Sequence, residues 1–454
     1  MRMGKSLGLW VAIAAVVLGA GCRDEIGHGP NPCNAAPCDI LEAECQRKVM
    51  EVVRCFRGGD EEVMPDVEVI TEDEYIELIT GDALTDEERA TYERFARGMA
   101  LFELSPEMPD LETDIAEYAA EIAAAYLTGD KRVVIIDRDE PLDSPGAFAT
   151  LAHELVHALQ DREIGLEDFY GAALPTLDAT LATRALIEGE AMHYDVLASA
   201  ALDGVHPAYI DWGSLYARYQ IDMLIDGYKD EAPIVLALVR FPYAFGGHYV
   251  TDAWLGGGHS SIENLFEDPP LSSSDVLYMK RSSDERLEQI EAFRERARLA
   301  PIDGYELVAY DELGSFILDG FLHRLELTDE QLLDPRVLWL IGDGATVLYN
   351  EADDHVVVAW RLSFEDGKAP NEESVSAFRE ALGAPDEAAP EPADDVTARV
   401  YSEGHDLIMI ASDAPLDAAF LGDAVSWEAA PTDEAMEETV PTAAKLCGRR
   451  CVFR

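Results

Sequence analysis

Basic residues are scarce in this sequence of 454 residues, where 34 Lys and Arg face 90 Asp and Glu and the formal net charge is −56. A surface of this charge repels phosphate backbones and anionic headgroups, so the sequence predicts no nucleic-acid partner and no membrane binding through basic residues. Two interpretations of the acidity stay open, which are solubility at high salt and the handling of basic partners. The rest of the composition is that of a globular protein, with 48% apolar residues and a length that suits about two to four domains.

A long hydrophobic run is missing at the N-terminus, where the apolar stretch over residues 7–18 is shorter than the about 20 residues of a membrane span. Arg2 and Lys5 precede it and Cys22 follows, in an arrangement that resembles a bacterial lipoprotein signal. Leu18 lies four residues before Cys22, whereas such signals usually place this residue three before. We expect a signal over 1–22, lipidation of Cys22 and a protein anchored in the periplasm or at the cell surface. The alternative is a secreted or periplasmic protein without the lipid.

No cysteine lies between Cys55 and Cys447. If Cys22 carries a lipid, an even number remains, which suits disulfide bonds in an oxidising compartment. The rival interpretation, a zinc ribbon, lacks the paired C-x-x-C spacing that it needs. We therefore expect these cysteines to staple the two ends of the chain, with connectivity left open: Cys33, Cys38, Cys45, Cys55, Cys447 and Cys451.

The patterns divide the chain into four segments: the signal over 1–22, a tether and Cys-rich segment over 23–60, a larger domain over 61–300 and a smaller α+β domain over 301–454. A β-branched run predicts a strand over 131–137. Ser144 as N-cap and Pro145 as first helical residue begin a helix that runs to about Arg162. A linker over 166–175 leads to a second helix over 177–202. Further predicted elements are a helix within 39–57, a strand at 67–70, strands at 337–339, 346–349, 355–360, 397–401 and 407–410, and a helix at 373–382.

The first of the two long helices contains His153, Glu154 and His157 in the pattern HExxH. Residues four apart share a helix face, so the two imidazoles can reach one ion, and Glu154 beside them can take a proton from water. Apolar neighbours mark the helix as buried, where an uncompensated polar trio would be costly and a metal ion would remove that cost. The alternative is two ordinary histidines beside a helical glutamate.

A catalytic zinc site needs a third protein ligand. On the second long helix, Glu188 lies in an apolar setting and is followed by Gly189, a poor helix former that suggests close packing beside the site. Glu190 is rotated by about 200° on an ideal helix and is expected to face away. His193 is less suitable, since it is turned from Glu188 and is expected near the polar side of the helix. Alternatively, Glu188 pairs only with Arg184 one turn earlier.

With Glu188 admitted, the chain resembles the gluzincins, metallopeptidases with an HExxH helix and a Glu-Gly-x-Ala ligand motif on a later helix. It is more closely similar to exported bacterial proteins that share an HELxHALQD segment, here at 153–161. Their other motifs have counterparts at 178–189, 242–246, 269–273, 311–314 and 342–343, so the resemblance covers about residues 67–410. It implies an α+β fold, with a mainly helical zincin-like domain that carries a small sheet. It also implies Zn²⁺ as cofactor, held by His153, His157 and Glu188.

This chain departs from these relatives at residues that are expected to take part in the reaction or to orient the metal ligands. Where they often carry His-Pro, this chain has Tyr278 followed by Met279, so Tyr278 is one candidate donor to the transition-state oxyanion and Tyr243 is another. For each tyrosine the alternative is a structural role in the core. Met192 occupies the position of the expected second carboxylate, so Asp161 or Asp178 is expected to orient a ligand histidine instead.

The function that follows is metal-assisted hydrolysis of peptide bonds, with Glu154 as general base and a peptide or protein as substrate. The strand over 131–137 is expected to pair with the extended substrate by strand addition. The rival is an inactive zinc-binding envelope lipoprotein that acts in binding or assembly, and a further rival is a structural lipoprotein without metal. The intact Glu154 argues against the inactive protein, whereas the departure at Tyr278 favours it.

Overall fold

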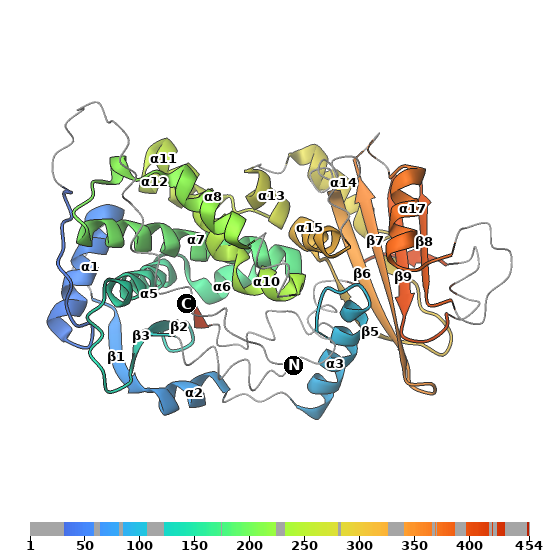
Figure 1. Ribbon diagram of the computed structural model, residues 1–454, viewed down its shortest axis with the longest axis horizontal. Helices are drawn as coiled ribbons and strands as arrows, with labels where there is room; N and C mark the ends of the chain where they lie inside the picture. The colour runs from blue at the N-terminus through green and yellow to red at the C-terminus, as the bar shows by residue number, and fades with distance from the viewer. Residues whose placement is uncertain are drawn as a thin grey trace.

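A computed structural model describes residues 31–58, 64–80, 85–106, 122–173, 175–223, 232–279, 283–325, 340–365, 368, 370–385, 396–416, 420, 425–431 and 452–453. The expected signal with Cys22, the predicted strand at 337–339, Cys447 and Cys451 lie outside these residues. A mainly helical part and a five-stranded sheet occupy opposite ends of the long axis (Figure 1). The predicted α+β class is confirmed at this level.

The helical part is built around two long helices, α5 (Pro145–Ile164) and α7 (Leu177–Leu202), which pack against each other. The Ser144 hydroxyl accepts the N–H of Ala147 at 3.0 Å, and α5 ends at Gly165 in the left-handed conformation. Both predicted helices are confirmed. The linker predicted over 166–175 is wrong in its first half, because Leu166 is buried and α6 (Leu166–Gly171) begins directly after Gly165.

A small mixed sheet lies beside α5, in the order β1 (Asp66–Thr71), β3 (Arg132–Asp137), β2 (Ala124–Leu127), β11 (Val452–Phe453). Strand β1 runs parallel to β3, and β2 pairs antiparallel with both β3 and β11. The strands predicted at 67–70 and 131–137 are confirmed. The role predicted for 131–137 is wrong: β3 has a strand on each side, so its backbone groups cannot pair with a substrate.

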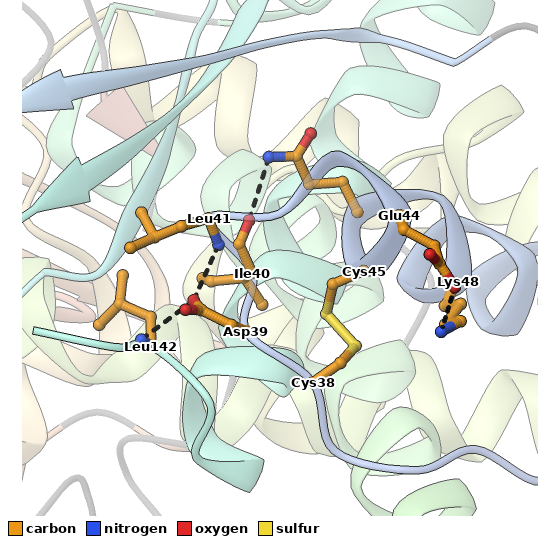
Figure 2. The surroundings of a disulfide bond; sticks show 9 residues. Cys38, Asp39, Ile40, Leu41, Glu44, Cys45, Lys48 and Leu142 are labelled. Carbon is orange, nitrogen blue, oxygen red and sulfur yellow. Dashed lines mark hydrogen bonds and ion pairs between the residues drawn. A yellow bond between two sulfur atoms is a disulfide. The ribbon is translucent and has the colours of Figure 1, made fainter.

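The N-terminal helix α1 (Ala43–Arg57) packs across both α5 and α7. Figure 2 shows the disulfide between Cys38 and Cys45, beside which the Asp39 carboxylate accepts the backbone N–H of Leu142, two residues before the N-cap of α5, at 3.2 Å. The second disulfide joins Cys33 to Cys55. Disulfides form and persist in oxidising compartments, so both bonds indicate an extracytoplasmic protein.

Shorter helices complete this part of the molecule. None of the helices among the described residues is long and apolar enough to cross a membrane. The shorter helices are α2 (Glu72–Thr80), the single 3₁₀ turn η2 (Pro207–Tyr209), α8 (Trp212–Asp222), α10 (Pro233–Val239), the π-helical turn η4 (Pro242–Gly246), α11 (Gly247–Gly257), α12 (His259–Glu267) and α13 (Ser273–Tyr278). Helix α14 (Asp284–Arg294) packs against the larger sheet instead.

The larger sheet is antiparallel throughout, in the order β5 (Glu306–Asp311), β6 (Leu340–Asn350), β7 (His355–Phe364), β9 (Asp406–Ser412), β8 (Ala398–Glu403). The same part of the molecule contains the helices α15 (Gly314–Arg324) and α17 (Glu372–Ala381). It also contains a two-stranded antiparallel sheet of β4 (Arg298–Leu299) and β10 (Trp427–Glu428). The strands predicted at 346–349, 355–360, 397–401 and 407–410 and the helix at 373–382 are confirmed. Helix α3 (Asp86–Ala100), far earlier in the chain, also packs on this sheet, and one hydrophobic cluster runs through both parts of the molecule.

Four carboxylates meet where the first turn of α7 lies beside the end of β5 and the first half of β6. We call this set the acidic junction: Asp178, Asp311, Glu312 and Asp343. Asp178 accepts the N–H of Ser273 at 2.8 Å, and burial raises its pKa to about 7. Burial also raises the pKa of Glu312 to about 7. The motifs at 178, 269–273, 311–314 and 342–343 therefore meet at one place, which joins α7 to the larger sheet.

Helix α7 and the turn η4 touch through their backbones. A Cβ on Gly189 would lie 2.4 Å from the carbonyl oxygen of Gly246, and a Cβ on Gly246 would lie 2.1 Å from that of Ala185. Only glycine fits at such distances, because real Cβ atoms do not approach carbonyl oxygens so closely. The close packing that Gly189 suggested is confirmed, and Gly246 is its counterpart.

We predict that Gly189→Ala lowers the free energy of unfolding by about 1–3 kcal/mol, since overpacking forces α7 and η4 apart. The control is Gly256→Ala in α11, where nothing lies within 4 Å of the added Cβ, and stability is expected to hold or to rise by up to about 1 kcal/mol. Urea unfolding of both variants measures the difference. Equal stabilities would contradict the close approach of the two elements.

Candidate metal centre

The structure brings the three predicted ligands together. His153 and His157 lie one turn apart on α5, and Glu188 reaches them from α7; we call these residues the ligand trio. The Glu188 Oε2 atom lies 3.1 Å from His153 Nε2 and 3.4 Å from His157 Nε2. All three side chains are buried, and one ligand atom from each lies within 4.8 Å of the others. This group can hold a metal ion.

The spacing of these atoms fits a metal ion of zinc's size. A tetrahedral ion with bonds of about 2.0–2.1 Å separates its ligand atoms by about 3.3–3.4 Å. The nitrogen-to-oxygen distances of 3.1 and 3.4 Å are close to that spacing. A cation between these atoms would satisfy two imidazoles and a carboxylate at once, in a buried place where each would otherwise be costly.

Glu188 is a carboxylate at neutral pH. Burial raises its pKa, but the contacts with His153, which hydrogen-bonds to it at 3.1 Å, and with His157 outweigh that effect and bring the pKa down to about 2. The Arg184 Nη2 atom lies 3.8 Å from the other carboxylate oxygen, Oε1, while Arg184 Nη1 donates to the Leu238 carbonyl. Glu188 thus contacts the histidines more closely than it contacts Arg184, contrary to the alternative in which it pairs with Arg184 alone.

Gln160 sets the orientation of His157. Its amide nitrogen donates to the Ile187 carbonyl at 2.9 Å, so its amide oxygen faces His157 Nδ1, 2.8 Å away. An amide oxygen only accepts, so Nδ1 carries the proton and Nε2 directs its lone pair toward Glu188. The expectation that Asp161 or Asp178 would orient this ligand is wrong. Asp161 accepts the hydroxyl of Tyr126 at 2.6 Å, and Asp178 belongs to the acidic junction.

The residues proposed for the reaction occupy two elements. Glu154 is fully buried on α5, next to His153 in the chain. Tyr243 lies in η4 with its ring stacked on that of His153, at 6.1 Å between centroids. Tyr278 is the last residue of α13, where it packs against the main hydrophobic cluster. The structure thus brings Tyr243 to the ligand trio, and the role of Tyr278 stays a prediction.

Two residues of α7 lie in surroundings that the sequence did not predict. His193 was expected near the polar side of the helix, but it is fully buried between Trp212 and Trp254, with ring centroids 5.0 and 4.8 Å away. Burial lowers its pKa to about 3, so this imidazole is neutral. Glu190 is not part of the group that can hold a metal ion, as expected, but it is fully buried and accepts from Gln160 Nε2 at 2.9 Å. Gln160, three residues after His157 on the same helix face, is the signal that the sequence offered.

The chain matches no protein-family model, no curated protein and no solved structure. The resemblance to the gluzincins therefore stays an expectation. What the structure establishes is a buried group of two imidazoles and one carboxylate with the spacing of metal ligands. Any assignment of function depends on that geometry.

We predict that the purified protein holds about one zinc ion per chain and that His157→Ala or Glu188→Ala reduces this to near zero, because each change removes one ligand of three. His323→Ala, at an exposed histidine of α15, should keep the wild-type content. Elemental analysis after dialysis measures zinc, and a chelator should lower the melting temperature of the wild type and of His323→Ala but not of the two ligand variants. Full zinc content in Glu188→Ala would exclude this carboxylate as a ligand.

Proposed function

We propose that this protein is an exported zinc-dependent peptidase. The observation that carries the proposal is the buried ligand trio with Glu154 on the same helical turn. Two histidines one turn apart, a glutamate between them and a carboxylate from a second helix form the donor set of a catalytic rather than a purely structural zinc site. A zinc ion held by these residues would supply Lewis acidity.

The protein's own residues then divide the remaining work. Glu154 is fully buried beside His153, and its carboxylate takes the proton from the attacking water molecule. It later returns that proton to the amine that leaves. Gln160 holds His157 with Nε2 toward the metal position. A protein with a merely structural metal ion would not need Glu154.

Tyr243 is the better placed of the two proposed oxyanion donors. Its ring stacks on His153, so it lies at the ligand trio, and η4 is locked against α7 through Gly246. A hydroxyl held by such a rigid turn can donate to the developing negative charge without reorganising. The π-helical turn is itself typical of functional sites.

The setting outside the cell follows from the disulfides, to which we add anchoring through a lipid on Cys22 as part of the proposal. The alternative function is an inactive zinc-binding envelope lipoprotein for binding or assembly. The loss of the expected histidine at Tyr278 favours it, and the intact Glu154 opposes it. Peptide cleavage decides between them.

We predict that Glu154→Gln abolishes cleavage of a mixed peptide library while zinc content is unchanged, since the amide cannot take a proton. Glu167→Gln, at an exposed residue of α6, is the matched control and should cleave like the wild type. Mass spectrometry of the digests with and without chelator gives the result. Wild-type cleavage by Glu154→Gln would refute its role, and a zinc-loaded wild type that cleaves nothing would favour the binding protein.

We predict that Tyr243→Phe lowers kcat by about 10²–10³-fold with zinc content and KM nearly unchanged, because the hydroxyl contacts the substrate only as charge develops. Tyr278→Phe, made in parallel, tests the second candidate in the same assay. Steady-state kinetics on one peptide found in the library digest separates kcat from KM. An unchanged kcat in Tyr243→Phe would remove this hydroxyl from the reaction.

A further inference from the structure

Arg57, the last residue of α1, is a buried cation between the two metal-bearing helices. Its side chain is 5% exposed. Its Nε donates to Glu190 Oε1 on α7 at 2.8 Å, and its two terminal nitrogens donate to the carboxylate of Glu163 on α5 at 2.7 and 2.6 Å. The guanidinium therefore cross-links α5 and α7 by charge-assisted bonds, which are among the strongest hydrogen bonds in proteins.

A continuous path of hydrogen bonds leads from this cation to a metal ligand. Glu190 binds Arg57 through Oε1 and accepts from Gln160 Nε2 through Oε2, at 2.9 Å. The amide oxygen of Gln160 then contacts His157 Nδ1 at 2.8 Å. Arg57, Glu190, Gln160 and His157 thus form a chain in which each link is between 2.8 and 2.9 Å.

The direction of every bond in this chain is fixed, because Arg57 only donates and both Glu190 and the Ile187 carbonyl accept from Gln160. Arginine only donates and a carboxylate only accepts, so Glu190 presents acceptors to both of its neighbours. Gln160 must then turn its amide nitrogen toward Glu190 and the Ile187 carbonyl, which leaves its oxygen for His157. The opposite amide orientation would point its oxygen at two acceptors and its N–H groups at Nδ1, and His157 would then carry its proton on Nε2.

We propose that Arg57 is a positioning residue for the metal site: through Glu190 and Gln160 it holds His157 in the tautomer that can bind a metal ion through Nε2. The proposal rests on the proposed function to the extent that it takes the ligand trio as a zinc site. It assigns to the N-terminal Cys-rich segment a part in metal binding, in addition to the stapling that its cysteines suggest.

The disulfide between Cys33 and Cys55 holds this cation in place. Cys55 lies in the last turn of α1, two residues before Arg57. On the other side of the bond, Asn31 donates to the Val205 carbonyl just after α7 at 2.8 Å and accepts the N–H of Cys33 at 2.9 Å. The residues at both ends of this disulfide therefore contact α7 or the residues just after it. The disulfide-bonded segment thus holds the guanidinium of Arg57 at Glu190.

The test compares Arg57→Met and Glu190→Gln with Arg361→Met. Arg361 is the matched control because it is an equally buried arginine, 5% exposed, paired with the buried Asp406 in the larger sheet, on β7 and β9. Zinc affinity is measured by competition with a chromophoric chelator. In the zinc-free proteins, ¹⁵N shifts of the imidazole nitrogens report the His157 tautomer, which a loss of general stability alone would not change.

We expect zinc affinity about 10–100-fold weaker in Arg57→Met and Glu190→Gln, and a mixture of His157 tautomers where the wild type has Nδ1–H alone. Arg361→Met should keep wild-type affinity and tautomer. Folded Arg57→Met with wild-type affinity and tautomer would overturn the proposal, as would an equal loss of affinity in Arg361→Met. If Arg57→Met does not fold, the isosteric Glu190→Gln decides by the same two criteria.

Failure of the proposed function gives a different result. A wild type that binds no zinc would refute the zinc peptidase, and the tautomer in the zinc-free protein would still test the chain from Arg57 to His157. Breaking the Cys33–Cys55 disulfide by a double Cys→Ser change should weaken zinc binding in the same direction. The same change at Cys38 and Cys45, at the other end of α1, should not. Equal effects of the two double changes would overturn the part given to Cys33–Cys55.

Discussion

The close approach of α5 and α7 is the constraint on which the rest of the structure depends. The ligand trio exists only where these helices lie near enough for Glu188 to reach both histidines. That approach buries carboxylates at 188 and 190 side by side on α7, and each needs a positive or donating partner. The two histidines face Glu188, and Arg57 and Gln160 bind Glu190.

The same constraint explains features that lie outside the site. Glycine at 189 and 246 lets η4 rest directly on α7, which brings Tyr243 against His153. The acidic junction fixes the first turn of α7 to the larger sheet through Asp178 and its neighbours. Helix α1 fixes the face around Glu190 through Arg57. Hydrogen bonds between backbone N–H groups and carboxylates thus hold one end of α7, and the ion pair of Arg57 and Glu190 holds its middle. Glu188 lies between these two places.

The sequence predicted the elements of the site but not their partners. Both long helices follow from local signals, such as Ser144 and Pro145, and His153, Glu154 and His157 follow from helical periodicity. The surroundings of Glu190 and His193 could not be predicted in this way. Helix geometry alone gives the direction of a side chain and not which residues of other segments pack against it. Arg57 comes from another segment, and Trp212 and Trp254 enclose His193 from two further helices. The prediction that the strand over 131–137 pairs with a substrate was wrong, because the order of strands in a sheet depends on segments that are distant in the sequence.

The buried polar groups around the metal position also bear on why the Cys-rich segment precedes the helical part. A buried glutamate such as Glu190 is stable only with a partner of opposite charge, and in a chain with 34 basic against 90 acidic residues such partners are few. Taking Arg57 from a disulfide-fastened helix secures one at a fixed place, where a flexible side chain from a loop would exchange with competing carboxylates. The oxidising environment that forms the disulfide is then also the environment that fixes Arg57 beside Glu190.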